Sequence, residues 1–262
     1  MKKLLFATAA ALTVTIAGAA SAADLPVKSE SPYVAPRFTW TGCYLGGSVG
    51  GGFAQKDITD PARLVQDQDP PFAAGAGATT GVTTASPSPS GVVIGGQIGC
   101  DYQFAPSWVI GIEGAAAGST MKGSSIVGLP LGNPDTALVE AKTDFLTSVT
   151  ARLGYAFDHV LLYGKGGVAM AADRYDVSGS FVGTPFGFTG LENRFGWTAG
   201  AGVEWLFTPH WSVNLEYDYY GFGTKTVSMF DSANVLLGNV DVRQNIQVVK
   251  VGFNFHIWGP GL

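Results

Sequence analysis

Residues 211–220 read Trp-Ser-Val-Asn-Leu-Glu-Tyr-Asp-Tyr-Tyr, a run in which apolar side chains alternate with small or polar ones. A period of two places successive side chains on opposite faces of a β-strand. One face of this strand is therefore apolar, and the other carries the two acids Glu216 and Asp218. Residues 249–256 repeat the pattern. These two stretches indicate strands with two chemically different faces.

The same alternation divides the chain into eight predicted strands, at residues 40–54, 91–104, 108–118, 143–157, 160–172, 194–207, 211–222 and 244–257. Their connections alternate between tight turns and long segments, the long ones at 55–90, 119–142, 173–193 and 223–243. All 14 prolines lie outside these strands, as a continuous hydrogen-bonded ladder requires. The sequence thus predicts an all-β fold, an eight-stranded antiparallel transmembrane β-barrel with short periplasmic turns and four long extracellular loops.

Composition supports a wall that faces lipid. Charged residues make up 13% of the chain and aromatic residues 12%, and the charged fraction is about half that of a typical soluble protein. Aromatic side chains gather where the bilayer core meets the headgroups. Those next to the tight turns are predicted to form a periplasmic girdle: Trp40, Phe104, Trp108, Phe157, Phe207 and Trp211.

The two ends of the chain carry different signals. Lys2 and Lys3 precede an apolar stretch that ends in Ala20-Ser21-Ala22, which predicts a signal peptide over residues 1–22 and export to the outer membrane. Residues 23–39 are predicted to form a periplasmic lead, residues 40–257 the barrel and residues 258–262 a tail. Without the two lysines, 13 basic and 20 acidic residues remain. The basic ones are scattered, so nucleic acid is not an expected partner.

Several motifs together resemble the small alphaproteobacterial outer-membrane immunogenic proteins, a porin family. They are Phe-Thr-Trp-Thr-Gly-Cys-Tyr-Leu-Gly-Gly at 38–47, Gly-Gly-Gln-Ile-Gly at 95–99, Arg-Leu-Gly-Tyr at 152–155 and the run 196–204. The resemblance implies a barrel distantly similar to the membrane domain of OmpA, often exposed at the cell surface. Some relatives are linked to hemin, but the predicted loops hold no cluster of His or Tyr, and no cofactor is expected.

The resemblance also implies a route into the membrane. Periplasmic chaperones and the barrel-assembly machinery are the expected partners, and the last strand carries the expected recognition signal at Lys250, Gly252, Phe255 and Ile257. Family members usually stop at a terminal Phe, so Ile257 and the tail depart from the pattern.

Alternation places seven charged side chains in the lumen: Glu113, Arg152, Lys165, Glu204, Glu216, Asp218 and Lys250. An eight-stranded barrel has an interior just wide enough for side chains, so these charges should pair across it. Two hypotheses remain open. The charges form a permanent plug, or they line a narrow or gated pore in which pairs such as Glu113 and Arg152 rearrange.

The histidines and cysteines are the remaining candidates for catalysis, metal binding or a disulfide. His159, His210 and His256 all fall on the periplasmic side, so no histidine can serve as a general base at the outer rim, and neither an enzyme nor a metal site is expected. Cys43 and Cys100 lie at similar depth on neighbouring strands. They either form a disulfide or remain two lipid-facing thiols.

Taken together, the sequence predicts a structural and surface-interaction protein that contacts outer-membrane lipid and host or environmental surface molecules. A small-solute pore is the alternative.

Overall fold

The computed structural model describes residues 39–59, 83–128, 136–181, 184–231 and 236–257. The predicted signal peptide, nearly all of the lead and the tail lie outside the described residues. Every described strand belongs to one compact unit, Pro36–Leu262. The strands are β1 (Gly42–Thr59), β2 (Thr83–Ala85), β3 (Ser90–Gln103), β4 (Trp108–Gly128), β5 (Thr136–Phe157), β6 (Val160–Phe181), β7 (Thr184–Thr208), β8 (Trp211–Asp231) and β9 (Leu236–His256).

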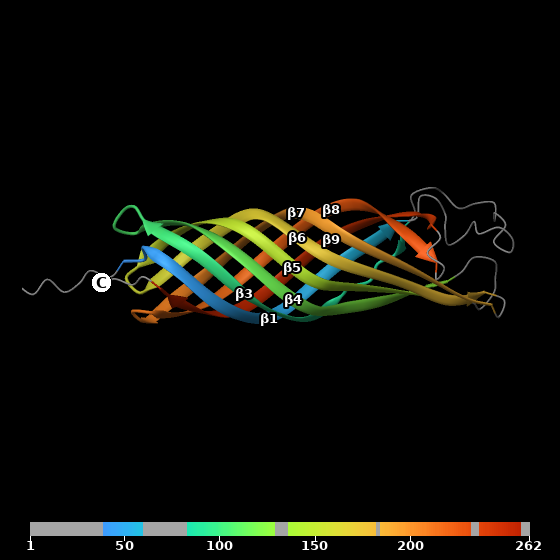
Figure 1. Ribbon diagram of the computed structural model, residues 1–262, viewed down its shortest axis with the longest axis horizontal. Coiled ribbons are helices and arrows are strands. Elements are labelled where there is room, and N and C mark those ends of the chain that lie inside the picture. Colours follow the sequence, from blue (N-terminus) through green and yellow to red (C-terminus); the bar gives the residue numbers. More distant parts are fainter. Residues whose placement is uncertain (1–38, 60–82, 129–135, 182–183, 232–235, 258–262) are drawn as a thin grey trace, which may run out of the picture. The chain divides into compact units, whose positions relative to one another are not determined.

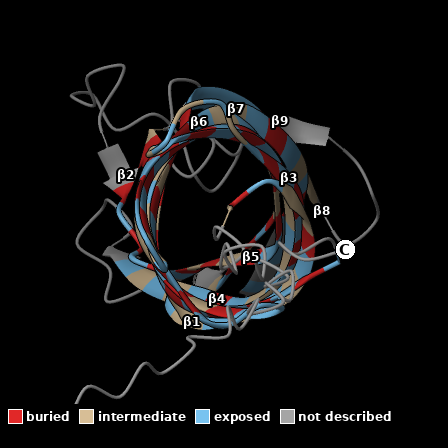
Figure 2. Cartoon of the chain, turned by 90° about the vertical axis from the view of Figure 1, so that its left-hand side faces the viewer, coloured by how far each residue is buried: buried red, intermediate tan, exposed pale blue. Residues whose placement is uncertain are grey.

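Eight long strands close into an antiparallel barrel, which confirms the predicted fold (Figures 1 and 2). Each pairs with its neighbour along the chain, and β1 also pairs with β9, where Tyr44 lies opposite His256. The short strand β2 adds to the end of β1. Beside it, the carbonyls of Pro87 and Pro89 accept hydrogen bonds from the amides of Lys56 and Ala54 at 3.2 and 2.7 Å. Proline lacks an N–H but keeps this acceptor, so both fit beside β1.

One end of the barrel carries the short turns and is called the short-turn end. Its turns, at 104–107, 158–159 and 209–210, lie within one residue of the predicted positions. The two-residue turn between β5 and β6 has Asp158 at φ 55°, a left-handed conformation that Asp tolerates better than most residues.

The opposite end, called the distal end, differs from the prediction. Most of the predicted loops 119–142, 173–193 and 223–243 are strand, so their predicted bounds are wrong. Pro185, predicted in a loop, is the second residue of β7, a position near a strand end where Pro is tolerated. A strand needs about 9–11 residues to cross a bilayer, whereas β4 to β9 have 21 to 25 residues each. About half of each therefore extends beyond a bilayer-sized segment.

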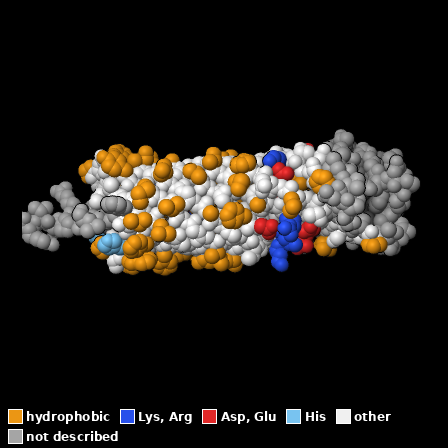
Figure 3. Space-filling view, viewed as in Figure 1, with side chains coloured by type: hydrophobic (Ala, Val, Ile, Leu, Met, Phe, Trp, Pro, Cys, Tyr) orange, Lys and Arg blue, Asp and Glu red, His pale blue; other side chains and the backbone are white. Residues whose placement is uncertain are grey.

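The outer surface of the barrel has an apolar band followed by a polar belt, as Figure 3 shows. On β1, the outward side chains Leu45, Val49 and Phe53 are exposed, and the next outward ones are Gln55 and Asp57. Similar changes on the other strands produce the belt of Lys, Arg, Asp and Glu that borders the orange band in the figure. Apolar outward side chains are required only where lipid contacts the wall.

Aromatic residues lie at both borders of the band. Five of the six predicted girdle residues are exposed at the short-turn end: Phe104, Trp108, Phe157, Phe207 and Trp211. Trp40 corrects the prediction, because it is 3% exposed and its Nε1 donates to the carbonyl of Asp158 at 3.1 Å. At the far border, Trp197 and Tyr219 have ring centroids 5.3 Å apart.

Inside, buried residues form successive layers along the barrel axis, and Figure 2 shows buried and exposed residues alternating around the wall. At the short-turn end, the short-turn plug consists of Trp40, Val109, Ala156, Leu161, Tyr163 and Leu206. A charged layer follows it. The next is an apolar middle layer of Ala54, Val93, Met121, Leu146, Ala169, Ala171, Tyr220, Phe222, Ile246 and Val248. A second charged group lies distal to the middle layer.

Within the described part of the chain, no helix is long and apolar enough to span a membrane.

Candidate functional site: charged layers inside the barrel

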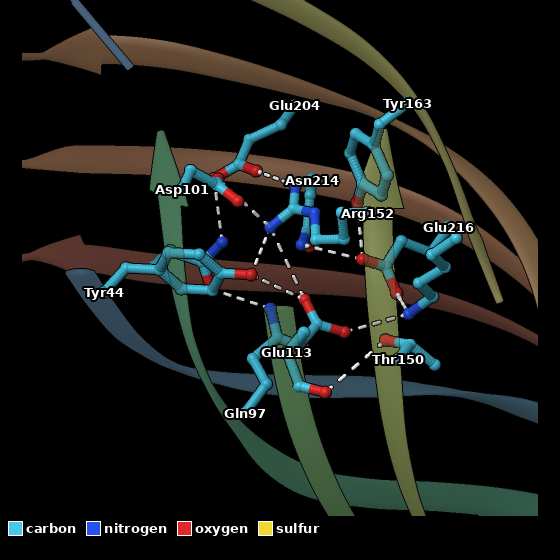
Figure 4. A network of polar contacts seen from close by, with 12 residues as sticks. Tyr44, Gln97, Asp101, Glu113, Thr150, Arg152, Tyr163, Glu204, Asn214 and Glu216 are labelled. Carbon is cyan, nitrogen blue, oxygen red and sulfur yellow. Dashed lines mark hydrogen bonds and ion pairs between the residues drawn. The ribbon is translucent and has the colours of Figure 1, made fainter. Parts of the chain in front are cut away.

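The layer next to the short-turn plug is a polar cluster, called the inner network (Figure 4). It contains all seven predicted lumen charges together with Asp101, His256 and uncharged partners. The residues are Tyr44, Gln97, Asp101, Glu113, Arg152, Lys165, Glu204, Ser212, Asn214, Glu216, Asp218, Lys250, Asn254 and His256, all buried. Because every second residue of each strand points inward, eight strands bring these side chains together from positions far apart in the sequence.

Arg152 lies at the centre of the inner network. Its Nη2 is 2.9 Å from Oε2 of Glu204, and its Nη1 is 3.5 Å from carboxylate oxygens of both Asp101 and Glu113. Nη1 also donates to the hydroxyl of Tyr44, which in turn donates to Oε2 of Glu113 at 2.8 Å. A planar guanidinium with several donors suits this bridging position better than a lysine would.

Two lysines organise the other half of the inner network. Nζ of Lys165 lies 3.0 Å from Glu113, 2.7 Å from Glu216 and 3.2 Å from Asp218. Nζ of Lys250 lies 2.9 Å from Glu216 and 3.2 Å from Asp218. Glu113 thus links the lysine half to the arginine half. Buried ion pairs with several partners offset part of the cost of removing charges from water.

Ser212, His256 and Glu204 form a small cluster at the short-turn side of the inner network. Ser212 Oγ donates to Oε1 of Glu204 at 2.5 Å and lies 3.0 Å from Nε2 of His256. A nucleophilic serine donates its proton to a histidine base. Nε2 of His256 also lies 3.5 Å from Oε1 of Glu204, so the carboxylate contacts the same imidazole nitrogen as the serine, whereas a triad places the acid at Nδ1. This arrangement supports Glu204 and does not match an acyl-transfer site.

The uncharged members of the inner network were not predicted, although the same alternation of inward and outward residues applies to them. Asp101 was also missed, although alternation along β3 places it on the inward face with Gln97. Tyr163 belongs to both layers, since it lies in the short-turn plug and its hydroxyl donates to Oε1 of Glu216. An inward Tyr, Asn or Gln next to inward charges was the available signal.

A small cavity of about 20 Å³ lies between the inner network and the middle layer, lined in part by Ser48, Ser148, Leu146, Tyr220 and Lys250. This volume accommodates about one water molecule. In the middle layer, the stacked rings of Tyr220 and Phe222 have centroids 6.4 Å apart. The middle layer therefore packs apolar side chains against the charged layer with little free space.

The second charged group, called the outer cluster, consists of Lys56, Thr143, Asp173, Tyr175, Arg194 and Gln244, all buried. Three donors converge on Oδ1 of Asp173: Nζ of Lys56 at 2.8 Å, Oγ1 of Thr143 at 2.6 Å and Nε2 of Gln244 at 3.3 Å. Arg194 is fully buried, and its Nη1 donates to the carbonyl of Val242 at 2.8 Å. This cluster was not predicted, because Lys56 and Asp173 fell in predicted loops.

Cys43 and Cys100 are bonded to each other, and they lie directly opposite on β1 and β3. Of the predicted assembly signal, Lys250 and Gly252 point into the barrel, whereas Phe255 and Ile257 are exposed. His159 and His210 lie at the short turns. Among the described residues, no group of three His, Cys, Asp or Glu side chains is arranged to hold a metal ion.

Comparison with known proteins gives the same picture. The family model described as outer membrane protein beta-barrel domain matches residues 7–255. The chain is 29% identical to the 31 kDa outer-membrane immunogenic protein of Brucella melitensis, over 97% of this chain and 99% of the relative. It is 28% identical to the 25 kDa outer-membrane immunogenic protein of Brucella abortus, again over 97% and 99% of the two chains.

Among solved structures, the outer membrane protease OmpT from Escherichia coli aligns with a TM-score of 0.48 and 9% identity, covering 84% of this chain and 98% of that one. The outer membrane protein OprG from Pseudomonas aeruginosa aligns with a TM-score of 0.43 and 16% identity, covering 82% and 97%. The match to the family model extends over almost the entire barrel. The chain therefore belongs to the outer membrane protein beta-barrel domain family and resides in the bacterial outer membrane.

Proposed function

We propose that this protein is a sealed barrel that anchors an extracellular, strand-built surface in the outer membrane and does not conduct solutes. The observation that carries the proposal is the layered interior. Charged side chains bind one another in the inner network, and the apolar middle layer packs directly on top of them. A solute crossing the lumen would have to break several buried ion pairs and then pass between apolar side chains.

The alternative, a gated pore, requires the charged pairs to rearrange. In the inner network Glu113 contacts both Arg152 and Lys165, and Glu216 contacts both Lys165 and Lys250. Separating one pair thus leaves a second contact in place, and removing a single partner from a buried pair is costly. This sharing of partners favours a fixed seal over a gate.

The surface role rests on the distal extensions and on the family. The strands carry polar and charged residues past the apolar band, where they face the cell exterior. Two relatives bear names that describe them as outer-membrane immunogenic proteins. In this proposal, outer-membrane lipid contacts the apolar band, and host or environmental molecules contact the distal extensions. Periplasmic chaperones and the barrel-assembly machinery insert the chain, reading Lys250, Gly252, Phe255 and Ile257.

Planar-bilayer recording of the refolded protein tests the seal. We expect no reproducible conductance steps from the wild-type barrel. A triple variant, Met121→Ala with Leu146→Ala and Phe222→Ala, removes large apolar side chains from the middle layer. It should give conductance steps only if the ion pairs of the inner network also separate. Ile112→Ala, on the exposed outer face, is the matched control. Wild-type steps whose size changes in Arg152→Ala would replace the sealed barrel with a pore.

Labelling of intact cells tests the surface role. Ser178→Cys places a thiol on the exposed face of the distal part of β6, and His159→Cys places one at a short turn. A membrane-impermeant maleimide should label the first variant in intact cells and the second only after permeabilisation. Equal labelling of both variants in intact cells would contradict the proposed display of the distal end.

A further inference from the structure

The outer cluster contains more positive than negative charge. Lys56 and Arg194 are buried there, and Asp173 is the one buried carboxylate that contacts them among the described residues. Two other acids lie nearby in the chain. Asp144 is exposed, and Glu192, which lies opposite Asp173 on the inward side of β7, pairs with Lys225 at 2.8 Å. Glu192 and Lys225 compensate each other, so the outer cluster keeps an excess of one positive charge.

The inner network has the opposite balance. It holds the five carboxylates Asp101, Glu113, Glu204, Glu216 and Asp218 and the three basic residues Arg152, Lys165 and Lys250, with His256 at its edge. The middle layer separates the two groups. The surplus acids of the inner network therefore cannot pair with Arg194, and the outer cluster must be neutralised from the distal side or remain charged.

Arg194 also has unused donors. Its Nη1 is bound to the carbonyl of Val242, but Nε and Nη2 have no hydrogen-bond partner although the side chain is 0% exposed. These two nitrogens lie on the same edge of the guanidinium, which is the edge that binds two oxygens of a carboxylate or phosphate in parallel. A buried donor without a partner costs about 1–3 kcal/mol, and more when it is charged.

Asp173 does not satisfy this edge. Its Oδ2 lies 3.5 Å from Nε of Arg194 and has no hydrogen-bond partner, while its Oδ1 is held by Lys56, Thr143 and Gln244. A small rotation could bring Oδ2 to Nε. Even then Nη2 would stay unpaired and the positive excess would remain, so rearrangement of Asp173 alone does not complete the cluster.

We propose that the outer cluster binds a small oxyanion, a carboxylate or phosphate group, that enters from the extracellular side. Nε and Nη2 of Arg194 donate to its oxygens, and Lys56, 4.7 Å from the centroid of the Tyr175 ring, supplies the second positive charge. The site lies distal to the middle layer, so it does not depend on whether the lumen conducts.

The first test measures the temperature at which the folded barrel converts to the unfolded form on detergent gels, at constant ionic strength. A ligand that binds only the folded state raises this temperature in a saturable way. Inorganic phosphate and acetate are the probes, and chloride is the reference salt. We expect phosphate or acetate to raise the midpoint above its value in chloride, Arg194→Gln to lose this increase, and the exposed Lys122→Gln to retain it.

A second test needs no substitution and therefore no variant that folds poorly. Equilibrium dialysis of the wild-type barrel against radiolabelled phosphate should show saturable binding that acetate displaces and chloride does not. Lys56→Met, which leaves Arg194 and Asp173 as a neutral pair, should weaken this binding at least tenfold. Absence of saturable binding to the wild-type barrel, or an equal midpoint increase in Arg194→Gln, would overturn the proposal.

Discussion

Arg152 on β5 and Glu204 on β7 meet inside the barrel with 2.9 Å between Nη2 and Oε2, although their strands do not pair with each other. β6 lies between them in the wall. The contact therefore ties two non-neighbouring strands together through the lumen, which backbone hydrogen bonds cannot do. The same holds for Lys165 on β6 and Glu216 on β8, 2.7 Å apart.

Removing Arg152 should destabilise the barrel strongly. Arg152→Met leaves Glu204, Glu113 and Asp101 without their shared cation, and breaking a buried pair from one side costs about 3–5 kcal/mol. Reversible urea unfolding in lipid vesicles measures this loss. The exposed Arg174→Met should change the unfolding free energy by no more than about 0.5 kcal/mol.

A second substitution separates lost pairing from lost packing. Adding Glu204→Gln to Arg152→Met removes one of the unpaired carboxylates and should recover part of the unfolding free energy. If the double variant is less stable than Arg152→Met by the full effect of Glu204→Gln alone, the two side chains do not interact energetically.

Replacing a glycine by valine should destabilise the barrel on its inward face and be tolerated on its outward face. A Cβ added at Gly202 would lie 2.6 Å from the ring of Tyr163 and 2.9 Å from Cγ of Glu216. Gly202→Val should therefore overpack the inner network at a cost of about 1–3 kcal/mol. At Gly47, on the outer face, the nearest atom would be the carbonyl oxygen of Gly95 at 3.7 Å. Gly47→Val should fold as efficiently as the wild type, measured by the folded fraction on unheated gels.

The bond between Cys43 and Cys100 should stabilise the barrel by restricting the unfolded chain. The two residues are separated by 57 positions, and a loop of this length predicts a contribution of about 2–4 kcal/mol. The Cys43→Ala and Cys100→Ala double variant should unfold at lower urea than the oxidised wild type. Once a reductant has opened the disulfide of the wild type, the two proteins should unfold at the same urea concentration. A difference that persists under reductant would show that packing of the sulfur atoms contributes to stability.

Fluorescence quenching by brominated lipids should locate the borders of the apolar band. Single-tryptophan variants that keep Trp211 or Trp197 should be quenched most by bromine near the headgroups, because these residues lie at the two borders. Leu215→Trp, between them on the exposed face, should be quenched most by bromine near the chain ends. Equal quenching of all three variants at every depth would show that the band has been placed wrongly.

The wall inside the membrane could be predicted because lipid imposes a strict rule on it. Outward residues such as Leu215 and Val251 must be apolar, and inward ones such as Glu216 and Lys250 can be polar. The predicted strands and the structure therefore agree closely at the short-turn end. Trp40 was placed wrongly because its position beside a turn suggested a girdle, whereas it packs inside the barrel.

The distal half obeys no such rule, since water contacts its outer face. Exposed Arg174 and buried Tyr175 and Asp173 alternate, but their polar character on both faces makes the segment read as a loop. The pairing of β8 with β9 shifts register between Gly221 and Gly223, which leaves Phe222 unpaired. Gly223 has φ 63° there, and glycine at this position favoured the prediction of a loop as well. The outer cluster escaped prediction in part for the same reason, because Lys56, Asp173 and Tyr175 lay in segments not recognised as strand. Its other members, Thr143, Arg194 and Gln244, were the first residues of predicted strands.

The strands that continue past the membrane also determine what an antibody would recognise. Neighbouring positions on this surface come from different strands, and at the closure of the barrel from opposite ends of the described chain, as where Asp57 on β1 lies opposite Arg243 on β9. Epitopes on the described distal wall are therefore conformational. Antisera raised against the folded barrel should lose much of their reactivity on boiled samples, and peptides copied from a single strand would be poor immunogens for this part of the molecule.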